Sequence, residues 1–148
     1  MTDGTVTYMC EPVRGLSLLY NVNNKFRHAE QRYKDGKVIG PELREVSLLE
    51  DDDWTRRRAN SIINAAFNTE QKKAVKGDSF GIGMNIDPDT GKVIEVDLTF
   101  YSTGKFGTIP LSVYTKIERQ LKNNVWFTPT EAGKKLNFIR RYWRHEFD

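Results

Sequence analysis

The sequence predicts an α+β domain: a three-stranded antiparallel sheet with two helices on one face, preceded by an N-terminal extension of short strands. Two observations lead to this fold. Apolar residues recur at helical spacing near residues 59–67 and 111–121, and they alternate with small or polar residues in two segments between these. Both helices must bury their apolar stripes, and one face of one sheet accommodates them most simply.

Composition sets the broad class. The chain has 148 residues, of which 29% are charged and 38% hydrophobic, as in an ordinary globular protein. We divide it into an extension, residues 1–50, that packs on a core domain, residues 51–148. The net charge of +3 is too small to indicate a nucleic-acid partner without a focused patch. Cys10 is the single cysteine, which excludes an intrachain disulfide and leaves the compartment open.

Membrane and export signals are not evident in the sequence. No stretch approaches the roughly 20 apolar residues that span a membrane. The first residues do not form a basic-then-apolar signal peptide. The start is interpreted either as natural or as the boundary left after a signal was removed.

The extension carries weaker structural signals than the core. Residues 5–10 and 16–22 predict short strands. Residues 23–36 fit either a helix or two strands joined by a turn at Asp35-Gly36, and strands are favoured. Residues 41–50 are interpreted as a connector.

The first core helix is expected after Asp51-Asp52-Asp53, with Asp53 as its N-cap and its acidic neighbours suited to the positive helix end. The second begins near Pro110, which suits a first helical turn, and ends at Asn123-Asn124. The apolar stripes are Ala59, Ile62, Ile63, Ala66 and Phe67 in the first helix, and Leu111, Tyr114, Ile117 and Leu121 in the second.

Segments 80–86 and 94–100 are predicted to form a hairpin. The apolar residues of both segments have even numbers, and both sets must face one core. Even-numbered residues of one strand must therefore lie opposite even-numbered residues of the other. A three-residue loop, Asp89-Thr90-Gly91, closed by Pro88 opposite Lys92, meets this condition with Gly91 in the left-handed region. The predicted pairs are Phe80 with Phe100, Ile82 with Leu98, Met84 with Val96, and Ile86 with Ile94.

The last strand is predicted over residues 136–147. An extended segment that starts at Val125 leads into it, interrupted by Pro129 and a turn at residues 131–133. The apolar residues change face between Phe138 and Ile139, which indicates a bulge or a strand buried on both faces.

Residues 54–147 resemble the C-terminal domain of TonB-type energy transducers. Four segments carry the resemblance: the hairpin 82–93, Ser102-Thr103-Gly104, Trp126-Phe127-Thr128-Pro129, and Gly133-Lys134-Lys135. This sequence shows neither the membrane anchor nor the proline-rich spacer of the transducers, and Tyr114–Gln120 stands in place of an alanine-rich helix. The resemblance therefore implies a stand-alone relative in the bacterial periplasm or cell envelope.

The resemblance also implies a function, because in that family an extended receptor peptide adds to the open edge of the last strand. An unpaired edge offers backbone N–H and C=O groups to an added strand. We expect a non-enzymatic interaction domain that binds a protein or extended peptide, with no cofactor, metal or nucleic-acid partner. The expected partner-binding residues are Leu136, Phe138, Arg140, Arg141, Tyr142 and Arg144.

Two alternatives stay open. Residues 5–22 can cover this edge, or its arginines can merely keep it soluble, and the chain is then an orphan structural or regulatory domain. A small-ligand binder or an enzyme instead needs a pocket between the extension and the sheet.

Other polar groups are interpreted as structural. Asp51-Asp52-Asp53 suits a helix N-terminus better than a calcium or magnesium ion, since no loop glycine or ligand spacing accompanies it. Residues 140–145 alternate as a strand does, so base stacking is not expected. His28 and His145 lack metal or triad spacing.

Polar and small residues of the hairpin define its second face. Glu95 and Asp97 are expected on a solvated face. Gly81 and Gly83 lie on the face opposite Ile82, where the N-terminal segment or Tyr101 is expected to cover them.

Overall fold

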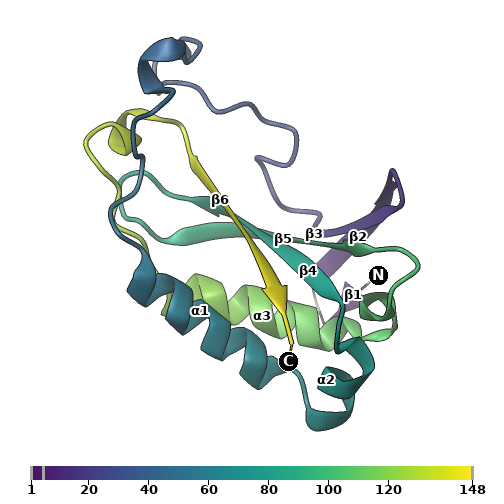
Figure 1. The fold of residues 1–148 in the computed structure, drawn as a ribbon. Helices are drawn as coiled ribbons and strands as arrows, with labels where there is room; N and C mark the ends of the chain where they lie inside the picture. The colour runs from purple at the N-terminus through teal and green to yellow at the C-terminus, as the bar shows by residue number, and fades with distance from the viewer. Residues whose placement is uncertain (1, 5, 148) are drawn as a thin grey trace.

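The structure is a computed structural model that describes residues 2–4 and 6–147; Thr5, where the first predicted strand begins, lies outside the described residues. An antiparallel sheet has the strand order β1-β2-β3-β5-β4-β6 (Figure 1). The strands are β1 (Thr2–Asp3), β2 (Val6–Val13), β3 (Leu16–Asn21), β4 (Ser79–Ile86), β5 (Val93–Tyr101) and β6 (Ile139–Glu146). The helices are α1 (Asp53–Ala66), α2 (Thr69–Val75) and α3 (Leu111–Asn124), with short 3-10 turns η1 (Pro41–Leu43), η2 (Lys105–Thr108) and η3 (Gly133–Lys135).

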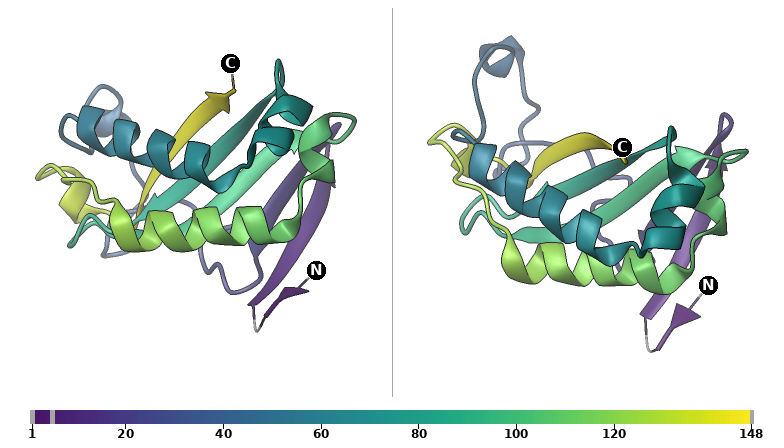
Figure 2. Two further views of the ribbon diagram at one scale, coloured as in Figure 1. Left: turned by 90° about the horizontal axis from the view of Figure 1, so that it is seen from below. Right: turned by 60° about the horizontal axis from the view of Figure 1, so that its bottom comes forward.

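Helices α1 and α3 lie side by side on one face of the sheet, as Figures 1 and 2 show, while the segment between β3 and α1 runs over the other face. This confirms the prediction that both amphipathic helices cover the same side. Ile63 and Ile117 are buried in one core with Phe80 and Phe100. Aromatic contacts join the layers, with ring centroids 6.0 Å apart for Phe67 and Phe80.

The start of α1 differs from the prediction by one residue. Asp52, not Asp53, is the N-cap, and its side chain makes no capping hydrogen bond. Asp51 takes over this role, because its Oδ1 accepts a hydrogen bond from the backbone nitrogen of Asp53 at 2.9 Å. Trp54, which lies off the apolar stripe, packs against Trp126 at the helix entrance, with ring centroids 4.7 Å apart.

The β4–β5 hairpin has the predicted register over most of its length, with Phe80 opposite Phe100 and Met84 opposite Val96. Its loop is one residue longer than predicted. Asp87, not Pro88, closes the ladder, donating to Lys92 O at 2.9 Å and accepting from Gly91 N at 2.8 Å. Pro88 cannot do this because it has no backbone N–H.

The longer loop changes the last pair of the hairpin. Ile86 lies opposite Val93 and not Ile94, because the register shifts between Asn85 and Ile86 and passes over Ile94 of β5. Gly91 has a φ of 75°, as the turn prediction requires.

The sheet is wider than the predicted three strands, because β2 and β3 add to it beside β5. They form a hairpin whose two turn residues, Arg14 and Gly15, have φ values of 51° and 82°. Two left-handed residues match the right-handed twist of a tight antiparallel hairpin. Strands β2 and β3 of the extension are therefore part of the same sheet.

The segment between β3 and α1 does not form the favoured strands. Tyr33 N donates to Lys37 O around a turn at Asp35-Gly36, but the ladder is limited to the single bridge Arg32–Val38. The segment instead follows other parts of the chain, with Lys34 N bonded to Lys135 O at 2.9 Å. These contacts are long-range, so local periodicity does not predict them.

Helix α2 was not predicted. Asn68 and Gln71 form a capping box at its start, which is a sequence signal for a helix N-terminus. The helix is only seven residues long, and its single buried residue, Val75, makes no apolar stripe.

The last strand begins at Ile139 and not at Leu136. Residues 136–138 pair with the extension, since Asn137 N donates to Arg32 O at 2.8 Å and Leu136 bridges Tyr33. Leu136, Phe138 and Ile139 are all buried, which explains the change of apolar face at this point.

Candidate functional site

β6 is the outermost strand on its side of the sheet, with β4 as its neighbour. Alternate residues of an antiparallel strand direct their backbone groups to opposite neighbours. Ser102 N donates to Gly15 O at 3.0 Å, so even-numbered residues of β5 face β3. Odd-numbered residues of β5 therefore bond to β4, and even-numbered residues of β4 bond to odd-numbered residues of β6. The N–H and C=O groups of the even-numbered β6 residues point away from the sheet: Arg140, Tyr142, Arg144 and Glu146.

We call these four outward positions the β6 edge. Within residues 2–4 and 6–147, no hydrogen bond joins their outward backbone groups to another segment. Residues 6–22, the part of the 5–22 segment that the structure describes, do not cover this edge, because β2 and β3 lie on the opposite side of β5. Residues 31–34 of the extension cover only the stretch before β6, around Leu136 and Phe138.

The other edge of the sheet is protected. β1 pairs with Val6 and Thr7 at the start of β2. Val22 N donates to Thr7 O, so odd-numbered residues of β2 direct their backbone groups toward β3. Even-numbered residues, including Pro12, direct theirs toward the open side of the strand. Proline has no N–H to offer, so an added strand meets a gap there. The exposed Cys10 also lies in this strand.

The predicted partner-binding residues divide into three groups. Leu136 and Phe138 are buried before the strand begins, and the ring of Phe138 stacks on Phe26 at 4.5 Å between centroids. Arg140 and Arg141 are engaged in ion pairs with Asp97 and Asp52. Tyr142 and Arg144 are exposed.

Odd-numbered residues of β6 face helix α1. Arg141 pairs with Asp52, the guanidinium of Arg56 lies 5.7 Å from the ring centroid of Trp143, and His145 contacts Asn60 and Asn64 at 3.3 and 3.2 Å. The partners on α1 recur every four residues, which keeps them on one side of the helix. His145 is therefore part of the packing between strand and helix.

Glu95 and Asp97 do not lie on a solvated face, which corrects the sequence prediction. Both are buried, because the segment after β3 folds over them. Glu95 accepts hydrogen bonds from the backbone nitrogens of Lys25 and Phe26 and from Asn85 Nδ2. This carboxylate therefore anchors the covering segment to the sheet.

Asp97 is held by Arg140. Arg140 Nη1 donates to Asp97 Oδ2 at 2.6 Å and Nη2 donates to Oδ1 at 2.9 Å. The pKa of the Arg140 guanidinium is raised, chiefly because Asp97 accepts these hydrogen bonds. Two parallel charge-assisted bonds fix both side chains in orientation.

Gly81 and Gly83 are covered, but not by the expected segments. A Cβ on Gly81 would overlap the hydroxyl of Tyr142, and one on Gly83 would overlap the guanidinium of Arg140. Both covering side chains come from β6, the strand beside these glycines.

A cavity of about 350 Å³ lies between the covering segment and the helix-free face of the sheet. We call it the polar pocket. Its lining includes Asn24, Phe26 and Gln31 from the segment, and Asp97, Thr99 and Arg140 from the sheet. The position of this pocket matches the requirement stated above for a ligand-binding alternative.

The sequence predicts other roles for Asp97 and Arg140 and does not bring the pocket residues together. One signal was available: the predicted register places Gly83 opposite Asp97, and a glycine beside an acid leaves room for a long side chain to reach across. No comparable signal links Asn24 or Gln31 to the sheet, since they approach it only through the path of the segment.

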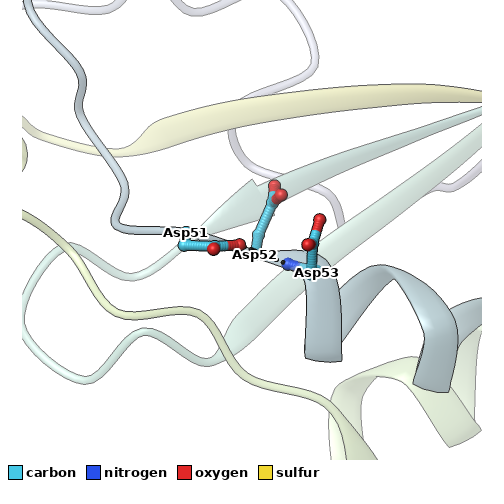
Figure 3. Close-up of side chains that lie close together, drawn as sticks. All are labelled: Asp51, Asp52 and Asp53. Atoms are coloured by element: carbon cyan, nitrogen blue, oxygen red, sulfur yellow. Dashed lines mark hydrogen bonds between the residues drawn. The ribbon is translucent and has the colours of Figure 1, made fainter.

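The acidic cluster at the start of α1 is compact. Carboxylate oxygens of Asp51, Asp52 and Asp53 lie within 4.8 Å of one another. Figure 3 shows the Asp51 carboxylate bonded to the backbone nitrogen of Asp53. Asp52 is paired with Arg141, so two of the three carboxylates already have partners within the protein.

Fold and site together define an α+β domain with helices on one sheet face, a polar pocket under the other, and one open edge. The chain belongs to the DUF5043 family, described as a domain of unknown function, whose model matches residues 4–143. It is similar to a solved structure, the crystal structure of a DUF5043 family protein from Bacteroides uniformis ATCC 8492. The two share 31% identity with a TM-score of 0.89, over 100% of this chain and 84% of the other.

A comparison with curated proteins finds no match. The family and structure matches show no link to TonB. In the described part of the chain, no helix has both the length and the apolar character needed to cross a membrane.

Proposed function

We propose that this protein is a non-enzymatic interaction domain that binds an extended peptide by strand addition along the β6 edge. One observation carries the proposal. Four consecutive outward positions of an edge strand have backbone groups without a partner in the described chain, while Pro12 and β1 protect the opposite edge. An added strand would gain its affinity from these backbone groups.

The side chains along the edge suggest what the peptide offers. Tyr142 is 52% exposed, and its ring offers an apolar surface to an added strand. Arg144 has no ion-pair or hydrogen-bond partner in the described chain. Arg140 and Arg141 are already neutralised by Asp97 and Asp52, so Arg144 is the free charge for an acidic residue of the peptide.

The resemblance to TonB C-terminal domains supports this mode of binding, since an extended receptor peptide adds to the last strand in that family. On the same ground we propose a bacterial periplasmic or cell-envelope location. The pairing of residues 31–34 with residues 135–138 limits the proposed site to the strand itself.

The test compares two substitutions at one position. Tyr142→Pro removes the side chain and the outward N–H, and it leaves the bonds from β6 to β4 intact because the N–H of residue 142 faces away from β4. Tyr142→Ala removes the side chain alone. Peptides are selected from a displayed library on the full chain, and their affinities for both variants are measured by calorimetry.

We expect Tyr142→Pro to bind at least about tenfold more weakly than Tyr142→Ala, since the hydrogen bond donated by the N–H of residue 142 is lost and a carbonyl oxygen of the peptide is left unpaired. Bound peptide should also slow amide exchange at Tyr142 and Arg144. Equal affinity for the two variants, or protection at another edge, would contradict strand addition along β6.

A further inference from the structure

We propose that the polar pocket binds a small neutral ligand that carries several hydroxyl groups, of about the size of one sugar or cyclitol ring. The pocket lies on the helix-free face under residues 24–31, whereas the β6 edge lies along the side of the sheet. The two sites share Arg140, whose side chain lines the pocket and whose outward backbone groups belong to the edge.

The charges of the pocket favour a neutral ligand. Arg140 is bound through two nitrogens to Asp97, and Arg27, which also lines the pocket, is paired with Glu11 at 2.6 Å. An anion would find an uncompensated positive charge only by displacing a carboxylate from one of these arginines, and a cation would find a free carboxylate only by displacing Arg140 from Asp97. Breaking such a partly buried pair costs more than a small ion regains.

The pocket's remaining hydrogen-bonding groups include both donors and acceptors. A guanidinium has five N–H donors, and three contacts to Asp97 and Asn85 leave Arg140 with two. Asn24 and Gln31 each donate one amide N–H, to Val96 O and Phe138 O, which leaves each side chain one N–H donor and its amide oxygen as an acceptor. The hydroxyl of Thr99 has no partner in the described chain.

A hydroxyl group both donates and accepts, so a ring that carries several of them matches this mixture. A carboxylate only accepts and an ammonium only donates, so the first leaves the pocket's acceptors unsatisfied and the second leaves its donors unsatisfied. Unsatisfied polar groups in a closed site cost affinity.

The walls of the pocket supply apolar contact for the carbon face of such a ring. Phe26 is half-buried and held in place by its stack on Phe138, and Leu18 and Ala29 also line the cavity. The volume of about 350 Å³ lies at the small end of the range for ligand sites, roughly 300–1,000 Å³. One ring fits better than a chain of rings.

The test is an NMR titration of the full ¹⁵N-labelled chain with myo-inositol, D-glucose and D-galactose, and with sodium citrate and arginine hydrochloride as charged probes. At least one of the three neutral probes should give saturable shifts in the amides of residues 24–31 and of Asp97 and Thr99. The charged probes should give none there. Peptide binding is a separate readout, because Arg140, which the two sites share, offers its side chain to the pocket and its outward backbone groups to the edge.

A filling substitution with a matched control decides whether the shifts report the pocket. Ala29 is exposed and lines the cavity, so Ala29→Phe should fill it and abolish the shifts without lowering the melting temperature. Ala65→Phe adds the same ring at an exposed position of α1 and should bind as the parent does. Thr99→Val, which removes one hydroxyl, should weaken binding about tenfold.

Three results would overturn the inference: no saturable shift with any neutral probe, shifts that persist in Ala29→Phe, or a charged probe that binds the pocket in their place.

Discussion

Asp97 on β5 and Arg140 on β6 form a two-pronged ion pair across β4, the strand that separates them. The contacts of 2.6 and 2.9 Å pass over Gly83. A Cβ at this position would overlap Arg140 Nη2 and Asp97 Oδ1, so the pair requires a glycine beneath it. This arrangement forms the floor of the polar pocket and removes one arginine from the charge available to a partner.

Gly83→Ala should therefore lower the free energy of unfolding by about 1–3 kcal/mol, because the new methyl group pushes the ion pair apart. Gly107→Ala is the matched control: its Cβ meets nothing closer than Phe100 at 3.7 Å, and stability should change little. Urea denaturation measures both. In an Arg140→Ala background the cost of Gly83→Ala should shrink, and an equal cost in both backgrounds would refute the steric link.

The hairpin loop gives a second comparison between glycines. Gly91 and Gly77 both have positive φ, at 75° and 83°, so alanine strains the backbone at either position. A Cβ on Gly91 would also overlap the carbonyl oxygen of Phe127, while nothing lies within 4 Å of one on Gly77. We expect Gly77→Ala to cost about 1–2 kcal/mol. Gly91→Ala should cost clearly more, and similar melting temperatures for the two variants would count against this account.

Glu95→Gln should loosen the segment that covers the sheet. The carboxylate accepts from Lys25 N and Phe26 N, and an amide in its place presents a donor to one of them. Amide exchange at Lys25 and Phe26 should become at least about tenfold faster, which corresponds to roughly 1.4 kcal/mol. Glu131→Gln, at an exposed side chain, serves as the control and should leave these amides unchanged.

Alkaline pH should destabilise the protein through Tyr114. Burial raises the pKa of this phenol above its ordinary value of 10.0, and its hydroxyl donates to Phe106 O at 2.6 Å. A group with a raised pKa in the folded state binds its proton more tightly there than in the unfolded chain. Its stabilising contribution is therefore complete below pH 10 and is lost as the pH rises above that value.

Urea denaturation between pH 8 and pH 11 measures this effect, and Tyr114→Phe is the reference. Above pH 10 the stability of the parent should fall relative to Tyr114→Phe by up to about 1.4 kcal/mol per pH unit. Parallel curves for the two proteins across this range would show that Tyr114 does not titrate on unfolding.

Much of the fold follows from the sequence by itself, because the signals are local. The apolar stripes from Ala59 to Phe67 and from Leu111 to Leu121 identify two helices, and the alternation in residues 80–86 and 94–100 identifies a hairpin on the same core. Because the apolar residues of both strands have even numbers, Phe80 is predicted opposite Phe100, as observed. The error of one residue at the loop has a local cause as well, since Pro88 cannot close the ladder.

Only the tertiary structure decided which charges and strand edges are available to a partner and which face of the sheet is covered. Segment 23–36 has no strong periodicity, and its path depends on Glu95 and Asn137, which lie far away in the sequence. Arg140, Arg141 and Arg144 look alike in the sequence, but Asp97 and Asp52 neutralise the first two. Whether a charge or a strand edge is available depends on which distant groups the folded chain brings beside it, and a local pattern carries no information about those partners.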